Sequence, residues 1–184
     1  MTRRHAAVAL AVLLAGCVSP APAPIPPGPQ GVQRIVVPKP ANRTQSPLVV
    51  DDPGWIDKVL SSDKKKTVSD VLASHLRNQL EQRGFLVKVS DTTKELPTLK
   101  TEIRRWEPYS ADWSLVVVDL TATVEDPQGG RTIWSVERTD WRIPTRDASS
   151  SREASIAAAT TIAETLVAGW TPAGRRLVDE EEEE

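Results

Sequence analysis

The sequence has one cysteine, two histidines, one phenylalanine and one tyrosine in 184 residues. A single cysteine excludes an internal disulfide. His5 lies in an apolar leader, so only His75 remains for a folded domain, where we expect it at the boundary of a helix. Zinc sites and serine hydrolases need further histidine or cysteine partners, and no glycine-rich phosphate loop is present. We therefore expect no enzyme, no cofactor and no metal site.

The chain also lacks an excess of basic residues and a long apolar run. Its formal net charge is -2, and removal of Arg3 and Arg4 with a leader makes it about −4. Without a basic excess to neutralise phosphates, nucleic acid is not expected as a partner. No apolar run reaches the roughly 20 residues that a membrane-spanning helix needs.

The single cysteine is also the most informative residue. Two arginines and a short small-apolar stretch precede it, as in a secretory leader. The run that it closes resembles the bacterial lipobox: Leu14, Ala15, Gly16 and Cys17. This resemblance implies cleavage before Cys17, acylation of its sulfur and new amino group, and attachment to a membrane through those acyl chains. An ordinary secretory signal is the alternative.

Val18, and not aspartate, follows the cysteine. By similarity to the sorting rule of enteric bacterial lipoproteins, this residue implies a lipid-anchored protein on the outer membrane that faces the periplasm. Six prolines between residues 18 and 31 favour an extended polyproline II spacer, which would reach roughly 40 Å from the membrane.

These features divide the chain into four parts. We expect a signal peptide at 1–16, a lipidated cysteine and proline-rich tether at 17–46, a folded domain at 47–178, and a disordered acidic tail at 179–184. The tail is a block of like charges, which is usually solvated.

Hydrophobic periodicity predicts two helices, at about 68–83 and 151–169. Thr67 is a suitable N-cap for the first helix, and Gly84 follows its end. We expect a first strand at 33–37 and a buried strand at 85–89. The remaining predicted elements are strands at 98–106, 113–125 and 131–143, a short strand at 47–50 and a helical turn at 54–60. The order predicts an α+β fold, with a mostly antiparallel sheet of four to five strands and two helices on one face.

Six tryptophans are unusual beside one phenylalanine and one tyrosine. Strict alternation along 131–143 places Trp134 and Trp141 on opposite faces of the sheet. One interpretation is that the tryptophans fill the core. The other is a surface that meets a partner or ligand, formed by Trp106, Trp113, Trp134 and Trp141.

The segments SDVLASHLRNQLEQRGFLV, LKTEIRRWEPYSADWSLVVVDLTATVED and GGRTIWSVERTDWRI, after a lipobox and a proline tether, resemble small α+β envelope lipoproteins. The similarity is to the YajG-like lipoproteins and, more distantly, to the PqiC-type auxiliary lipoproteins of ABC transport. It covers about residues 65 to 170. It implies a non-enzymatic domain, tethered to the outer membrane.

Four functions remain open. The first is a non-enzymatic protein that docks on another envelope protein. The second is an auxiliary lipoprotein of a transport system that handles lipid or lipopolysaccharide. The third is a module that binds peptidoglycan. The fourth is an enzyme built on a carboxylate pair, such as Asp119 with Glu137 or Glu102 with Glu107.

Overall fold

The computed structural model describes residues 23–45, 66–91, 93–109 and 111–174. The leader, the lipobox, the acidic tail and the elements expected at 47–50 and 54–60 lie outside the described residues. Within these ranges the elements follow the order β1 (Arg34–Val36), β2 (Ala41–Asn42), α3 (Val68–Gln82), β3 (Leu86–Lys88), β4 (Thr98–Pro108), β5 (Leu115–Glu125), β6 (Thr132–Pro144) and α4 (Ser151–Leu166).

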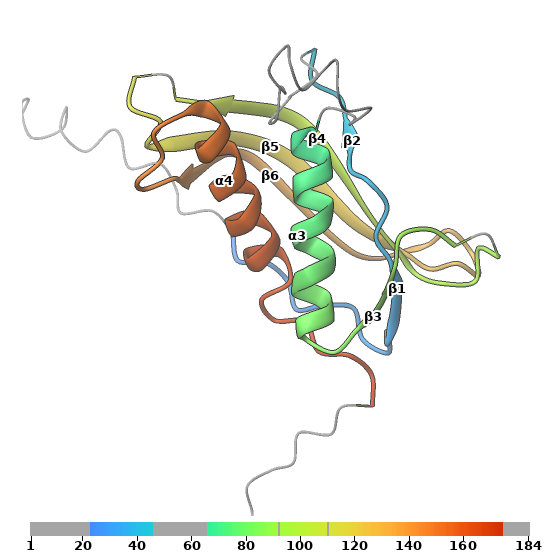
Figure 1. The fold of residues 1–184 in the computed structure, drawn as a ribbon. Coiled ribbons are helices and arrows are strands. Elements are labelled where there is room, and N and C mark those ends of the chain that lie inside the picture. The colour runs from blue at the N-terminus through green and yellow to red at the C-terminus, as the bar shows by residue number, and fades with distance from the viewer. Residues whose placement is uncertain (1–22, 46–65, 92, 110, 175–184) are drawn as a thin grey trace, which may run out of the picture.

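The α+β class is confirmed, with both helices on one face of a single sheet (Figure 1). The sheet has six strands in the order β3-β1-β4-β5-β6, and β2 pairs with β4 beside this path. β4, β5 and β6 are antiparallel, whereas β1 and β2 run parallel to β4, and β3 runs parallel to β1. The sheet is therefore mixed, with more strands than the four to five predicted.

The N-terminal boundary of the domain also differs from the expectation. β1 lies inside the sheet between β3 and β4, and Ile35 and Val37 are fully buried. β2 adds a second parallel pairing, through Ala41 and Asn42. The tether expected at 17–46 is thus too long, because part of it folds with the domain.

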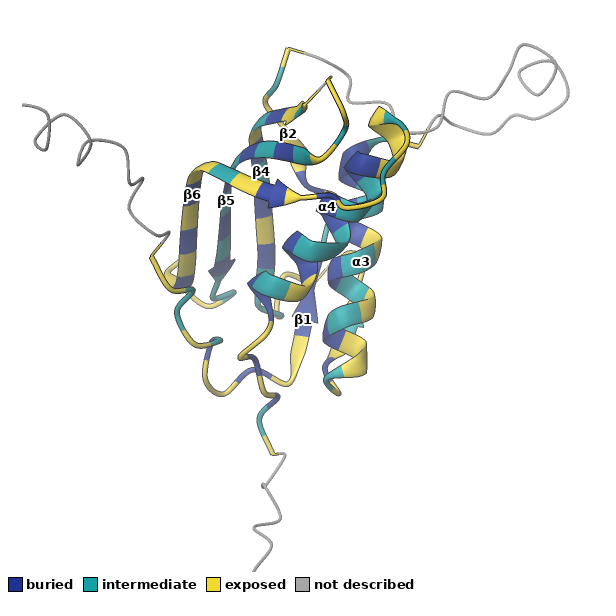
Figure 2. Ribbon diagram, turned by 90° about the vertical axis from the view of Figure 1, so that its left-hand side faces the viewer, coloured by how far each residue is buried: buried dark blue, intermediate teal, exposed yellow. Residues whose placement is uncertain are grey.

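β5 lies inside the sheet, between β4 and β6, and its residues alternate strictly between buried and half-buried. Its even-numbered residues from Val116 to Val124 are fully buried, and its odd-numbered residues are half-buried. Figure 2 shows this alternation as bands along the strands, with the helices on one side. An antiparallel sheet with one covered face has this pattern.

The helices pack on the sheet through Leu72, Leu76 and Leu80 of α3 and through an alanine-rich face of α4. Small side chains on α4 let the two helices approach closely. Half-buried His75 lies 3.3 Å from the Thr160 hydroxyl, joining α3 to α4. His75 is thus a boundary residue between the helices.

α3 begins with a capping box. Thr67 accepts from the Asp70 N–H at 3.4 Å, and Asp70 accepts from the Thr67 N–H at 2.9 Å. Partial burial raises the pKa of Asp70, but hydrogen bonds from Lys39 and Thr67 outweigh it, so the pKa lies below the ordinary 3.8. The contribution of Asp70 to stability is therefore present above pH 3.8 and is lost as the pH falls through the lower folded value.

Candidate interaction surface

The four tryptophans expected on a partner surface lie in or against the core. Trp106 is 5% exposed and Trp134 is 6% exposed. Trp113 and Trp141 are half-buried and pack against the core cluster. The Trp106 indole N–H donates to the Ser155 hydroxyl at 3.2 Å, which ties β4 to α4. The core interpretation therefore holds for Trp106 and Trp134, whereas half-buried Trp113 and Trp141 keep part of their surface exposed.

A β-bulge explains why both tryptophans of β6 face the helices. Leu120 of β5 pairs with Arg138, and Val118 pairs with Trp141. β5 advances two residues over this interval while β6 advances three, so the extra residue reverses the alternation. Asp140 lies within the bulge and has a φ of 51°. Trp141 consequently shares the helix face with Trp134.

The residues before β1 pack over the inner side of β6. We call residues 23–32 the N-terminal strap. The Trp134 indole N–H donates to the Pro26 carbonyl at 3.3 Å, and the Arg138 guanidinium donates to the Ala23 carbonyl at 2.5 Å. A Cβ on Gly28 would lie 2.5 Å from Cγ of Trp170, so only glycine fits there without displacement. Part of the expected proline spacer is therefore held on the domain.

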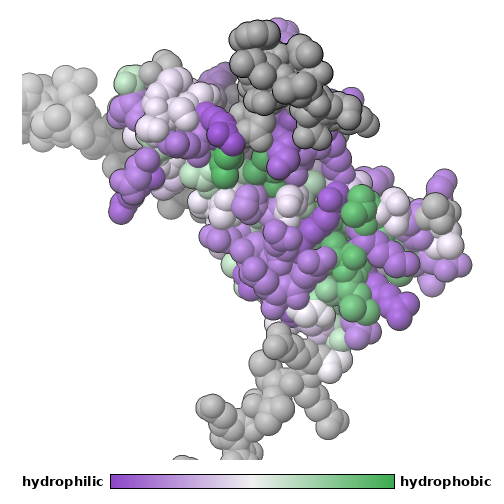
Figure 3. Space-filling model, in the orientation of Figure 1, coloured by the Kyte–Doolittle hydropathy of each residue, from purple (hydrophilic) through white to green (hydrophobic). Residues whose placement is uncertain are grey.

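Two of the most exposed aliphatic side chains lie on the edge strand β3 and directly after it. Leu86 is 53% exposed and Val89 is 59% exposed, while Val87 is half-buried. We define the β3 surface as Leu86, Val87 and Val89 with their neighbours Arg34 and Lys88. Figure 3 shows hydrophobic side chains gathered beside α3 on this side of the molecule.

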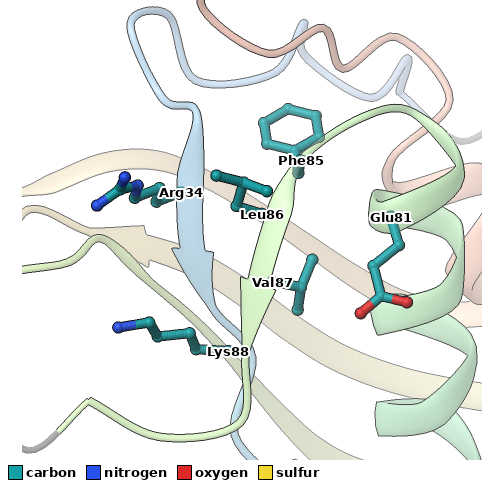
Figure 4. A pocket seen from close by; sticks show the side chains of 6 residues that line it. All are labelled: Arg34, Glu81, Phe85, Leu86, Val87 and Lys88. Carbon is teal, nitrogen blue, oxygen red and sulfur yellow. The ribbon is translucent and has the colours of Figure 1, made fainter.

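Part of the β3 surface borders a groove of about 370 Å³ between β3 and α3. In Figure 4, Val87 points toward Glu81 of α3, whereas Arg34, Leu86 and Lys88 lie on the other side of the strand. This edge thus combines an apolar centre with two cationic side chains at its rim.

The local sequence explains how this edge forms. α3 ends before Gly84, whose φ of 92° reverses the chain direction. Phe85 then enters the core at 3% exposure. Leu86 donates its N–H to the carbonyl of Gln33, just before β1, and the Lys88 carbonyl accepts from the N–H of Val37, just after β1. In a parallel pair, the intervening Val87 backbone groups point away from β1.

The sequence predicts a buried strand at 85–89. The strand forms, but the prediction of burial is wrong, because one side of it is exposed. Sequence reasoning missed Leu86 and Val89 as surface residues because a continuous apolar run is typical of a strand covered on both faces. Lys88 within that run is the one local signal of an edge.

The open face of the sheet carries ion pairs. Arg104 contacts Glu137 at 2.5 Å, and Arg105 contacts Glu107 at 2.7 Å. The hydrogen bond from Arg105 lowers the pKa of Glu107. Arg104 of β4 thus pairs with an acid of β6 across the sheet, whereas Glu107, the partner of Arg105, lies in the same strand.

The carboxylates considered for catalysis enter this network. Asp119 accepts from the backbone N–H of Asp140 at 2.6 Å, while Glu102 and Glu137 contact Arg43 and Arg104 respectively. Among the described residues, no group of three or more histidine, cysteine, aspartate or glutamate side chains is arranged to hold a metal ion. Within the same ranges, neither helix qualifies to cross a bilayer. Cys17 and its lipobox residues Leu14, Ala15 and Gly16 lie outside the described residues, so lipidation stays a prediction.

Comparisons with known proteins add little. No family model matches the sequence, and no curated protein matches it. The resemblance to YajG-like and PqiC-type lipoproteins therefore stays a prediction.

Several solved structures are similar to the chain. A PelC dodecamer from Paraburkholderia phytofirmans has a TM-score of 0.47 and 20% identity, over 79% of this chain and 93% of that chain. The protein XCC0632 from Xanthomonas campestris has a TM-score of 0.48 and 19% identity, over 77% and 86%. The lipoprotein GNA1162 from Neisseria meningitidis has a TM-score of 0.38 and 12% identity, over 65% and 86%. At TM-scores below 0.5, these likenesses carry no argument about activity or partners.

Proposed function

We propose that this protein is a lipid-anchored envelope protein that works by contact with another envelope protein and catalyses no reaction. The lipobox at Cys17 supports an anchor on the outer membrane with the domain in the periplasm. The observation that carries the contact function is the β3 edge. Leu86 lies there beside Arg34 and Lys88 on one side of the strand, and Val89 follows its end; Leu86 and Val89 are each more than half exposed. Apolar side chains grouped on a surface with a polar rim are typical of protein interaction sites.

The chemistry of the β3 surface indicates the kind of partner. Leu86 supplies apolar area, and Arg34 and Lys88 supply positive charge on the same side of the strand. A partner segment with an apolar side chain and neighbouring acids complements both features. Exposed tryptophans would favour the lipid-handling alternative, but Trp106 and Trp134 are buried and do not support it.

The proposal predicts that Leu86 contributes directly to partner binding. Full burial of a leucine is worth about 1.5–3 kcal/mol, and covering the exposed half is worth about 1 kcal/mol. In Leu86→Asp, a charge must also be desolvated, so we expect at least a roughly tenfold loss of affinity. A photo-crosslinking amino acid at position 88 measures this loss in cells, as the yield of a defined adduct.

Tyr109→Asp is the matched control, because Tyr109 is also 53% exposed but follows the far end of β4. The adduct at position 88 should persist in Tyr109→Asp and disappear in Leu86→Asp. No adduct in the parent protein, or an equal yield in both variants, contradicts the proposed surface. An adduct that contains glycan in place of protein indicates a peptidoglycan module.

A further inference from the structure

The N-terminal strap limits how far the domain can lie from a lipid anchor. The described chain is already held on the domain at Ala23, whose carbonyl accepts from Arg138. Arg138 is 9% exposed, and Ile25 packs against the core. The strap is thus part of the fold from its first described residue.

The covalent geometry of the chain limits the distance between Cys17 and Ala23. Cys17 precedes Ala23 by only six residues in the sequence. A fully extended chain covers at most about 3.3–3.6 Å per residue, so these residues span no more than about 20 Å. This is about half the reach that a spacer up to residue 31 would allow.

We infer that the strap holds the β6 side of the domain against the membrane surface and turns the β3 surface away from it. This inference rests on the proposed lipidation of Cys17. Arg138, which holds Ala23, belongs to β6, one edge of the sheet, and β3 forms the other edge. Figure 2 shows β6 and β1 on opposite sides of the sheet. Four strand spacings of about 4.8 Å separate the two edges by roughly 19 Å.

The strap contacts therefore limit the height of the domain and favour orientations in which the β6 edge lies nearer the membrane than the β3 edge. If the strap detached as far as Val32, which is 5% exposed, fifteen residues would follow the anchor. A free linker of this length reaches about 50 Å and permits any orientation of the domain. With the strap bound, the β3 surface faces the periplasm, where a protein partner can approach it.

Energy transfer in vesicles tests this orientation. Acylation consumes the thiol of Cys17, so one added cysteine provides a single labelling position. We place a donor dye in the lipidated full-length chain, either at Thr139→Cys on β6 or at Lys88→Cys on β3; both residues are exposed. The vesicles contain phosphatidylethanolamine and phosphatidylglycerol with an acceptor dye on the headgroups. We expect clearly stronger transfer from position 139 than from position 88.

A longer linker between the lipidated cysteine and the domain is the matched control. Insertion of fifteen glycine and serine residues after Val18 leaves the fold untouched, and the difference between the two positions should largely disappear. Equal transfer from both positions with the native linker, or stronger transfer from position 88, overturns the inference. Mass measurement of the same sample separates the two proposals. An acylated chain with equal transfer refutes the orientation alone, whereas a chain without acyl groups refutes the anchor as well.

Discussion

Replacement of Trp170 by alanine is expected to lower the free energy of unfolding by about 3–5 kcal/mol, the range for a large aromatic residue removed from a core. Trp170 is 2% exposed and packs edge-to-face on Trp134 at 4.8 Å between ring centroids and on Phe85 at 6.2 Å. Its ring also contacts Gly28 of the strap. This side chain thus joins three segments of the fold, and its loss leaves a cavity among all of them.

Urea unfolding followed by circular dichroism measures this change, and two phenylalanine variants serve as controls. The Trp170 indole nitrogen is buried and has no hydrogen-bond partner among the described residues, whereas the Trp134 indole donates to Pro26. Trp134→Phe should therefore cost about 1 kcal/mol more than Trp170→Phe, the net value of one hydrogen bond. A loss below 1 kcal/mol in Trp170→Ala contradicts the packing described.

Replacement of Cys17 by serine is expected to release the protein from the membrane. Each buried methylene of an acyl chain contributes about 0.8 kcal/mol, and two chains already give stable anchoring. A serine hydroxyl at this position does not provide the thiol that the lipobox resemblance implies as the acylation site. Fractionation after a carbonate wash measures the effect, with most of the parent protein in the pellet and most of Cys17→Ser in the supernatant.

Ser19→Ala is the control for this experiment, since it lies close to the anchor and leaves the cysteine intact. It should remain in the pellet with the parent protein. Retention of Cys17→Ser in the washed pellet would show that something other than acyl chains holds the protein on the membrane.

Local sequence signals predicted the helices and the central strand well. Thr67 marks the start of α3 through its own side chain. Gly84 follows its end because a left-handed residue there is strained for any side chain with a Cβ. The alternation from Val116 to Val124 predicts the buried face of β5, since that strand keeps one phase over its whole length.

The position of the tryptophans could not be predicted by alternation, because bulges interrupt it. One register shift lies between Ile103 and Arg105, and another reverses β6 before Trp141. The only local signal in β6 is Asp140, a residue type depleted in strands. A strand pattern read without this interruption places Trp141 on the wrong face.

Contacts between distant residues account for the remaining differences. The prolines predict an extended chain, but the docking of Pro26 depends on Trp134, which lies 108 residues away. The exposure of Leu86 likewise depends on which strand occupies the edge, and β1 lies between β3 and β4. The proline segment carries no local signal of its docking on Trp134, and the segment of Leu86 carries only the weak signal of Lys88.

The most direct test of the whole account is the mass of the mature N-terminus, measured on protein from cells grown with labelled palmitate. We expect a chain that begins at Cys17, carries the label on that residue, and loses the label in Cys17→Ser. An unlabelled chain, or one that retains residues 1–16, would contradict the anchor and with it the proposed orientation of the domain.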